Sequence, residues 1–205
     1  MHPEYRARVV EALRAETGFA LRCAENYFEA MQSMAPFTAL SGVVRNLAVD
    51  LCRIANDLRL LSSGPRVGLA EIQLPAVQPG SSMMPGKVNP VMAEMLNMVC
   101  FQVIGNDSAI ACAAQAGQLE LNVMMPGIAA ALLESLTILR NAVHVFTERC
   151  VKGIQANEAQ CRAYAERSTA IVEVVLEKGL MPEAQLDEIL RLEAMTDPGI
   201  PGYNV

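Results

Sequence analysis

Residues 88–119 read VNPVMAEMLNMVCFQVIGNDSAIACAAQAGQL and carry only two charges, Glu94 and Asp107. The stretch is rich in alanine, methionine and other residues that favour helices. A helix that is apolar on all its sides must be buried, either in a core or between subunits. The stretch therefore predicts a long buried helix that begins near Pro90, and it points to an all-α fold.

Two further long helices are predicted, one on each side of this stretch. Residues 127–150 carry one apolar stripe, and in residues 37–62 the apolar side chains stand one, three or four positions apart, which places them on one helix face. The members of the stripe in 37–62 are Leu40, Val43, Val44, Leu47, Leu51, Ile54, Leu58 and Leu61. Shorter helices are predicted over residues 3–17, 24–33, 157–178 and 182–192, with Gly18 and Gly179 as helix ends and Asn157 as an N-cap.

These elements predict part of a long-helix bundle over residues 1–151, which includes the loop 80–90. A shortened, small helical domain is predicted over residues 152–205. Three long helices with wide apolar faces need more packing partners than they supply to one another. We therefore expect the chain to associate with itself.

Composition narrows the class of protein. The chain has 205 residues, of which 52% are hydrophobic and 19% charged, and this excludes a disordered chain. A net charge of −6 without clustered basic residues argues against nucleic-acid binding. The six cysteines form no C-x-x-C pair and fit no zinc spacing, so we expect free thiols, a cytoplasmic location and no metal. The sequence has no uninterrupted apolar run of about 18 residues, so we expect a soluble protein that does not bind membranes.

Residues 62–90 interrupt the helical pattern with prolines and glycines and end in GSSMMPGKVNP, at Gly80–Pro90. Long loops inside compact proteins are usually functional. Lys87 is the only cation among residues 67–139, and it lies just before a helix start, where free N–H groups favour an anion. Asn89 is predicted as the cap of that helix. Local physics predicts either a mobile lid that grips a small carboxylate or phosphate, or an ordinary solvated loop.

The segment GSSMMPGKVNP resembles the signature loop of the aspartase/fumarase superfamily, G-S-S-x-M-P-x-K-x-N-P, and fills every fixed position of that pattern. Residues 56–75 and 101–107 also read like this family, so the resemblance extends along most of the chain. Residues 24–34 and 117–124 are similar to aspartases. Fumarate hydratases typically have His-Phe where this chain has Gln118-Leu119.

The resemblance implies a lyase that reversibly deaminates L-aspartate to fumarate and ammonia, without a cofactor, in a cytoplasmic homotetramer. One alternative is a fumarate hydratase. Another is an inactive helical fragment that acts only in subunit association.

The same resemblance assigns roles to five residues. Ser81 matches the catalytic base, which removes a proton from the carbon beside a substrate carboxylate. Lys87 and Asn89 match residues that bind the substrate carboxylates, and Ser82 matches a neighbouring contact. Glu94 matches a carboxylate that orients a histidine from another subunit, although a paired core carboxylate is the simpler interpretation of a lone charge in so apolar a helix.

Two features depart from the family pattern. The family's upstream substrate contacts are not in this sequence, neither His2 nor His144 stands in the family's histidine motif, and Met1 reads as an internal start in a longer frame. Residues 167–172 run directly into residues 173–180, where family members usually carry an N-P-x-x-G-Y segment and another helix. We therefore expect this chain by itself to be catalytically incomplete.

Overall fold

The computed structural model describes residues 2–64, 67–84 and 86–190. The regular structure of the described residues is helical apart from two short strands, which confirms the predicted all-α class. It divides into two compact units, each with its own internal contacts. The first comprises Met1–Asp57 and Val91–Cys150, and the second comprises Leu58–Pro90 and Val151–Val205. The predicted division into a bundle part, residues 1–151, and a small C-terminal domain, residues 152–205, stays a prediction.

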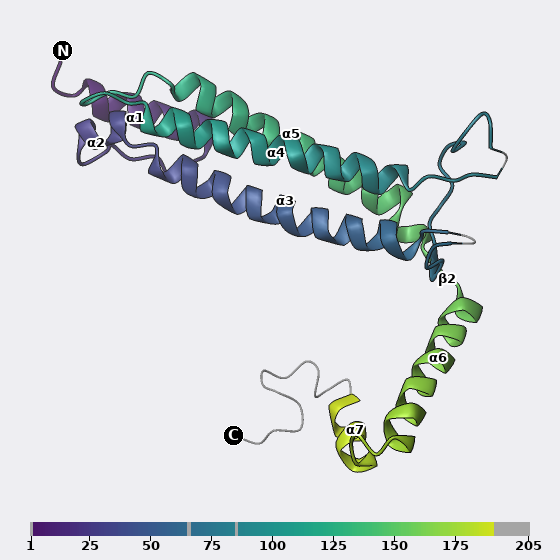
Figure 1. Ribbon diagram of the computed structural model, residues 1–205. Helices are drawn as coiled ribbons and strands as arrows, with labels where there is room; N and C mark the ends of the chain where they lie inside the picture. The colour runs from purple at the N-terminus through teal and green to yellow at the C-terminus, as the bar shows by residue number, and fades with distance from the viewer. Residues whose placement is uncertain (1, 65–66, 85, 191–205) are drawn as a thin grey trace. The chain divides into compact units, whose positions relative to one another are not determined.

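The first unit contains α1 (Tyr5–Thr17), α2 (Tyr27–Gln32), α4 (Val91–Gln115), α5 (Met125–Arg149) and all of α3 (Ala35–Leu61) up to Asp57. The three long helices run side by side (Figure 1). Each long helix lies within a few residues of its predicted span, because a repeat of 3.6 residues is a strong signal over so many turns.

The core of this unit lies between α4 and α5. Met34, Ile110, Ile128 and Leu132 form a buried apolar cluster there. Deeper along α4, Leu96 and Cys100 are fully buried. These positions confirm a long helix after Pro90 and bury one of its faces, but Met98 (63%) and Phe101 (60%) of α4 are exposed. Burial of the helix on all its sides stays a prediction that concerns the assembly.

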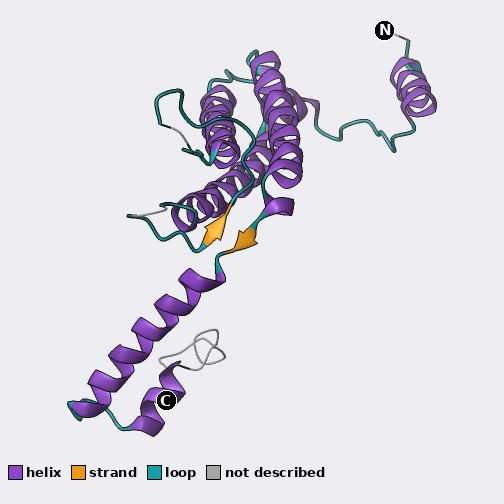
Figure 2. Ribbon diagram, turned by 90° about the vertical axis from the view of Figure 1, so that its right-hand side faces the viewer, coloured by secondary structure: helices purple, strands orange, loops and turns teal. Residues whose placement is uncertain are grey.

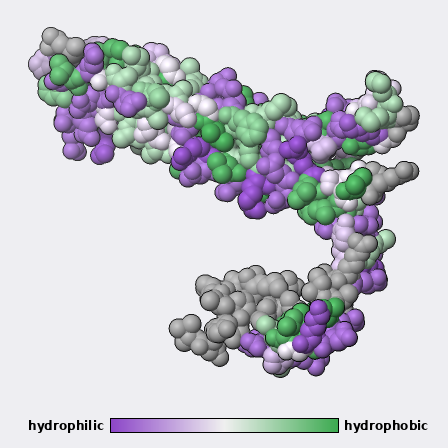
Figure 3. Space-filling view, viewed as in Figure 1, coloured by the Kyte–Doolittle hydropathy of each residue, from purple (hydrophilic) through white to green (hydrophobic). Residues whose placement is uncertain are grey.

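Helix α3 packs with a face that only partly overlaps its apolar stripe: Val44 of the stripe is buried, whereas other members are exposed. Its buried residues are the small side chains Ser41, Val44, Ala48 and Ala55. Four large members of the stripe are instead exposed, and they form what we call the outer stripe: Leu40 (46%), Val43 (66%), Leu47 (50%) and Ile54 (42%). Apolar patches are visible along the bundle surface in Figure 3. The small side chains let α3 make polar contacts with α4, such as the 2.6 Å hydrogen bond from Ser41 Oγ to Asp107 Oδ1.

The stretch Met125–Gly153, which contains α5, is long and apolar enough to cross a membrane by length and composition alone. Core helices pass the same test. Ile128, Leu132, Leu139 and Phe146 of this helix are buried within the first unit.

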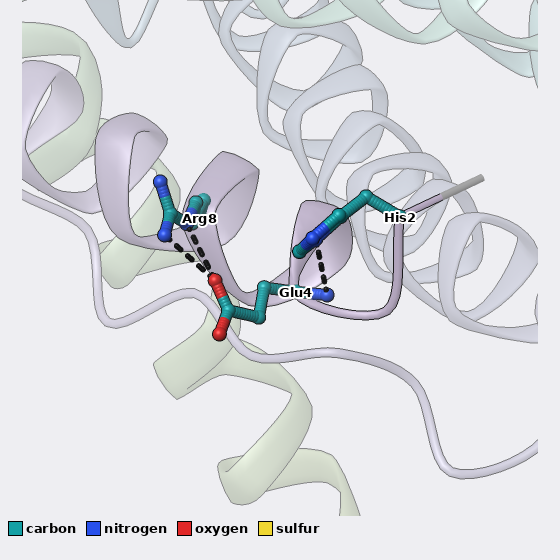
Figure 4. Close-up of polar contacts among 3 residues, drawn as sticks. All are labelled: His2, Glu4 and Arg8. Carbon is teal, nitrogen blue, oxygen red and sulfur yellow. Dashed lines mark hydrogen bonds and ion pairs between the residues drawn. The ribbon is translucent and has the colours of Figure 1, made fainter.

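The N-terminal helix α1 is held by local contacts. Arg8 Nη2 forms an ion pair with Glu4 Oε2 at 2.6 Å, and the backbone N–H of Glu4 donates to His2 Nδ1 at 3.3 Å (Figure 4). The helix ends as predicted at Gly18, which adopts a left-handed φ of 71°. His2 therefore takes part in a local turn at the start of α1, and His144 is exposed on α5.

The second unit combines the long loop with the C-terminal residues. Strand β1 (Ile72–Gln73) pairs antiparallel with β2 (Gln155–Ala156), which follows the 3-10 turn η1 (Val151–Gly153) (Figure 2). Helices α6 (Glu158–Glu177) and α7 (Glu183–Leu190) come after them. Helix α6 continues without a break past residues 172 and 173, between which family members usually carry a further segment. The predicted end of α7 at residue 192 and the tail lie outside the described residues.

Candidate functional site

The loop Gly80–Pro90 is closed at its base by two hydrogen bonds. The backbone N–H of Gly80 donates to the Lys87 carbonyl at 2.9 Å, and Asn89 Nδ2 donates to the Gly80 carbonyl at 3.1 Å. A side chain at Gly80 would place its Cβ 2.2 Å from the Lys87 carbonyl oxygen. Only glycine therefore permits this closure.

Ser81 lies just inside the closed base, and its hydroxyl oxygen receives two backbone donors. The N–H groups of Met83 and Met84 lie 3.1 and 3.2 Å from Ser81 Oγ. Donors aimed at an oxygen stabilise its anion more than its neutral hydroxyl. The local turn thus favours the ionised form that a serine base needs.

A hollow of about 480 Å³ lies beside Ser81. Lys87 lines the same hollow, so the structure brings the predicted base and the predicted carboxylate-binding cation together. Lys87 is exposed, and no ion pair found among the described residues uses its ammonium group. An anion in the hollow would therefore meet a cation that no described carboxylate neutralises.

Two of the predicted contacts differ from expectation. Helix α4 begins at Val91, and the Asn89 amide closes the loop base by donating to Gly80, so the observed bond of this side chain is not that of a helix cap. Ser82 is exposed and is not among the residues that line the hollow. The roles of Asn89 and Ser82 toward a substrate stay predictions.

Glu94 belongs to the other compact unit. It lies in the first turn of α4 and is partly buried. Its predicted role, the orientation of a histidine from another subunit, stays a prediction.

A second cavity, of about 460 Å³, lies behind the loop within the same unit. Gly86, Val88 and Asn89 form one side of it, and Ala70 and Asn157 also line it. Sequence analysis identified Asn157 only as the N-cap of α6. That prediction is correct, because its side chain accepts from the Gln160 N–H at 3.5 Å, but Asn157 Nδ2 also donates to the Ala70 carbonyl, 87 positions away in the chain, at 2.8 Å. A contact between such distant residues has no periodic signal in the sequence.

The cysteines show no metal site. All six are free thiols. Among the described residues, no group of three or more His, Cys, Asp or Glu side chains could hold a metal ion. Burial of Cys100, together with the neighbouring Cys52 thiol, raises the pKa of Cys100 from 9.0 to about 12, and burial also raises the pKa of Cys150. These buried thiols therefore stay protonated at neutral pH.

Comparison with known proteins identifies the family. The sequence model of the family described as Lyase matches residues 1–105. Aspartate ammonia-lyase from Helicobacter pylori is 44% identical over 224 residues, which cover 96% of this chain and 48% of that protein. The crystal structure of fumarate lyase:delta crystallin from Brucella melitensis superposes with a TM-score of 0.80 at 48% identity, over 90% of this chain and 43% of that one. The class II fumarase of Schistosoma mansoni superposes with a TM-score of 0.78 at 33% identity, over 96% and 50% of the two chains.

The chain thus spans about half the length of the curated relatives that it matches. The match to the Helicobacter protein runs over 224 residues, more than the 205 of this chain, so that relative carries residues inside the matched region that this chain lacks. This agrees with the predicted shortening, although its place near residue 172 stays a prediction. The family match over half of the chain and the similarity along nearly all of it lead to one conclusion: the chain belongs to the lyase family of the aspartase/fumarase superfamily.

Proposed function

We propose that this chain supplies the base-bearing loop of an enzyme that reversibly deaminates L-aspartate to fumarate and ammonia. The observation that carries the proposal is the environment of Ser81, whose hydroxyl oxygen accepts two backbone N–H groups beside the hollow that Lys87 also lines. The similarity to aspartate ammonia-lyases over nearly the whole chain supports L-aspartate as the substrate.

In the proposed reaction, the Ser81 oxyanion removes a proton from the carbon next to a substrate carboxylate. The electron pair of that C–H bond moves into the carboxylate and gives a dianionic aci-carboxylate. Lys87 stabilises this dianion by its charge, with Asn89 and Ser82 as neighbouring contacts. The electron pair then returns to form the carbon–carbon double bond as the C–N bond breaks and ammonia leaves. No cofactor is needed, because the proton and the electron pair stay within the substrate and Ser81.

The proposal includes assembly into a cytoplasmic homo-oligomer, a tetramer by family resemblance. The outer stripe of α3 supports association, because it places four large apolar side chains of one helix face in water. In a mixed assembly, Glu94 would meet a histidine from a full-length relative, because neither His2 nor His144 of this chain stands in the family's histidine motif. A complete site would also need the substrate contacts that the family places upstream of this loop.

A mixing experiment tests the proposal. Purified chain is incubated with L-aspartate while the absorbance of fumarate is followed, alone and together with a full-length relative whose own serine base has been replaced by alanine. We expect negligible fumarate production from the chain alone, because catalytic groups that act as a unit give little activity as a partial set. We expect production in the mixture. Co-assembly without any fumarate production would overturn the proposal.

A fumarate hydratase is the second candidate, and the likeness to the Schistosoma fumarase is the observation that favours it. Its identity of 33% is lower than the 44% of the Helicobacter aspartate ammonia-lyase. Incubating the mixture with fumarate in water, without ammonia, separates the two candidates. Consumption of fumarate under that condition would support the hydratase. An inactive helical fragment would co-assemble and show neither activity.

A further inference from the structure

The first turns of α6 hold three consecutive carbonyl groups of the long loop. The Tyr164 hydroxyl donates to the Leu69 carbonyl at 3.2 Å, and Asn157 Nδ2 donates to the Ala70 carbonyl at 2.8 Å. The Asn157 backbone N–H donates to the Glu71 carbonyl, also at 2.8 Å. We call these bonds the carbonyl clamp. It joins a helix start to a loop segment that has no regular structure of its own.

The middle residue of the clamped segment has an unfavourable backbone. Ala70 has a φ of 52°, in the left-handed region that residues with a Cβ rarely adopt. Such a conformation persists only where surrounding contacts fix it. Two contacts fix Ala70: its N–H donates to the Ser63 carbonyl at 2.7 Å, and its carbonyl accepts from Asn157 Nδ2.

The clamped segment faces the candidate site through the second cavity. Ala70 and Asn157 line that cavity together with Gly86, Val88 and Asn89, the end of the loop that carries Lys87. The loop base in turn depends on Asn89, which donates to Gly80, next to Ser81. Asn157 and the end of the loop therefore share one cavity, and Asn89 links the lining of that cavity to Gly80, next to the proposed base.

We propose that Asn157 is a positioning residue, which fixes the wall against which the loop Gly80–Asn89 settles. The oxygen and the nitrogen of its side-chain amide form separate hydrogen bonds. Oδ1 caps α6 through Gln160, while Nδ2 holds Ala70. The C-terminal residues thereby control the geometry of the loop without contacting a substrate. The role in catalysis rests on the proposed function, and the effect on the loop does not.

The substitution Asn157→Asp separates these two hydrogen bonds. A carboxylate keeps an oxygen for the cap of α6 but replaces the N–H donor with an acceptor that faces the Ala70 carbonyl. The matched control is Asn26→Asp, because Asn26 caps α2 through Phe28 and Glu29 and belongs to the other compact unit.

Hydrogen exchange followed by mass spectrometry on the full chain gives the structural readout. Loss of the part-buried hydrogen bond from Asn157 to Ala70 corresponds to an exchange rate about tenfold faster, so Asn157→Asp should raise exchange in residues 67–90 by about tenfold. Exchange in α4 and α5 should not change, and Asn26→Asp should leave residues 67–90 unchanged. Unchanged exchange in residues 67–90 of Asn157→Asp would overturn the proposal, since a residue that only caps α6 gives that result.

Two further variants keep the test decisive. Adding Ala70→Gly to Asn157→Asp should bring exchange back toward the natural rate, because glycine adopts a positive φ without a supporting contact. If Asn157→Asp does not fold, Tyr164→Phe removes only the hydroxyl that bonds Leu69 and should raise exchange in the same residues to a smaller extent. Absence of that rise would equally contradict the carbonyl clamp.

In the mixed assembly, Asn157→Asp should lower kcat about tenfold and change KM less than about twofold, since misplacing a reacting group affects the transition state more than substrate binding. An equal rise in KM with unchanged kcat would contradict a positioning role. If the unsubstituted mixture is inactive, the proposed function fails, while the exchange experiment still decides the role of Asn157 in the loop.

Discussion

The hydroxyl oxygen of Ser81 lies 3.2 Å from the backbone nitrogen of Met84 and accepts its hydrogen bond. The Met83 N–H donates to the same oxygen at 3.1 Å. A serine hydroxyl is a poor base unless its oxyanion is stabilised, and backbone N–H groups provide such stabilisation at no further cost in side-chain ordering. The loop therefore distinguishes Ser81 from its neighbour Ser82, for which no comparable pair of donors is found among the described residues.

This difference predicts unequal effects of two matched substitutions. In the mixed assembly, Ser81→Ala should lower kcat by about a thousandfold, which is the range for removal of a general base. Ser82→Ala should lower it by about tenfold or less, because only a neighbouring contact is lost. Rates of fumarate production by the two variants, at equal degrees of co-assembly, check this. Equal losses would contradict the assignment of the base to Ser81.

Lys87 should matter for activity and not for stability. Its side chain is exposed, so Lys87→Ala should change the free energy of unfolding by no more than about 0.5 kcal/mol. In the mixed assembly it should weaken both substrate binding and turnover, because the charge acts on the carboxylate in the ground state and in the transition state. Lys178→Ala is the control, since Lys178 is exposed at the end of α6 and does not line the hollow. Urea unfolding and steady-state kinetics measure the two effects.

Asn122 should contribute strongly to stability. It is fully buried, its Nδ2 donates to the carbonyls of Ala113 and Ala114, and its Oδ1 accepts from the Met124 N–H at 2.9 Å. Asn122→Ala leaves these groups without partners and should lower the free energy of unfolding by about 2–4 kcal/mol. Asn26→Ala, which removes an exposed helix cap, should cost about 1 kcal/mol. A smaller loss at Asn122 than at Asn26, measured by urea unfolding, would show that the buried bonds are not what stabilises the α4–α5 connection.

The outer stripe predicts association. Light scattering of the natural chain at micromolar concentration should give a mass above that of one chain. Leu47→Glu places a charge in the middle of the stripe and should shift the chain toward the monomer while the helical circular dichroism remains. Arg53→Gln, at an exposed position off the stripe, should not. A natural chain that is stably folded and monomeric would contradict the prediction.

Cys100 predicts a loss of stability at high pH. Its pKa is raised from 9.0 to about 12 in the folded chain, first by burial and then by the Cys52 thiol. The unfolded chain therefore releases this proton at lower pH than the folded chain does, so the contribution is complete below pH 9 and is lost as the pH rises toward about 12. Urea unfolding at several pH values, with Cys100→Ala for comparison, measures it. A pH dependence in this range that is the same in both proteins would assign the effect to other groups.

The sequence predicts much of the helical structure because the signals for a helix and its ends lie within a few neighbouring residues. The buried face of α4, the left-handed Gly18 and the cap at Asn157 all follow from residues within one or two turns. The roles of the loop residues come from the resemblance and stay predictions, and the structure adds that Ser81 and Lys87 line one hollow.

Features that depend on distant partners could not be predicted in the same way. The stripe of α3 shows which side chains are apolar but not which neighbour covers them, and in this chain the small residues Ala48 and Ala55 pack inward instead. The hydrogen bond from Asn89 to Gly80 could not be predicted either, because it depends on how the whole loop closes. The hydrogen bond from Asn157 Nδ2 to the Ala70 carbonyl joins distant parts of the chain, and no local pattern identifies it.

The hydrogen bond between Gly80 and Lys87 also bears on the entropy of ligand binding. A flexible loop loses conformational freedom when its two ends are brought together, and in many binding loops that loss accompanies the arrival of the ligand. Here the ends of the loop are already joined, and a Cβ at residue 80 would force them apart. An anion that binds beside Ser81 would therefore not have to bring the ends of the loop together, so the closed base favours affinity. Any side chain larger than glycine at position 80 should weaken binding without removing a ligand contact.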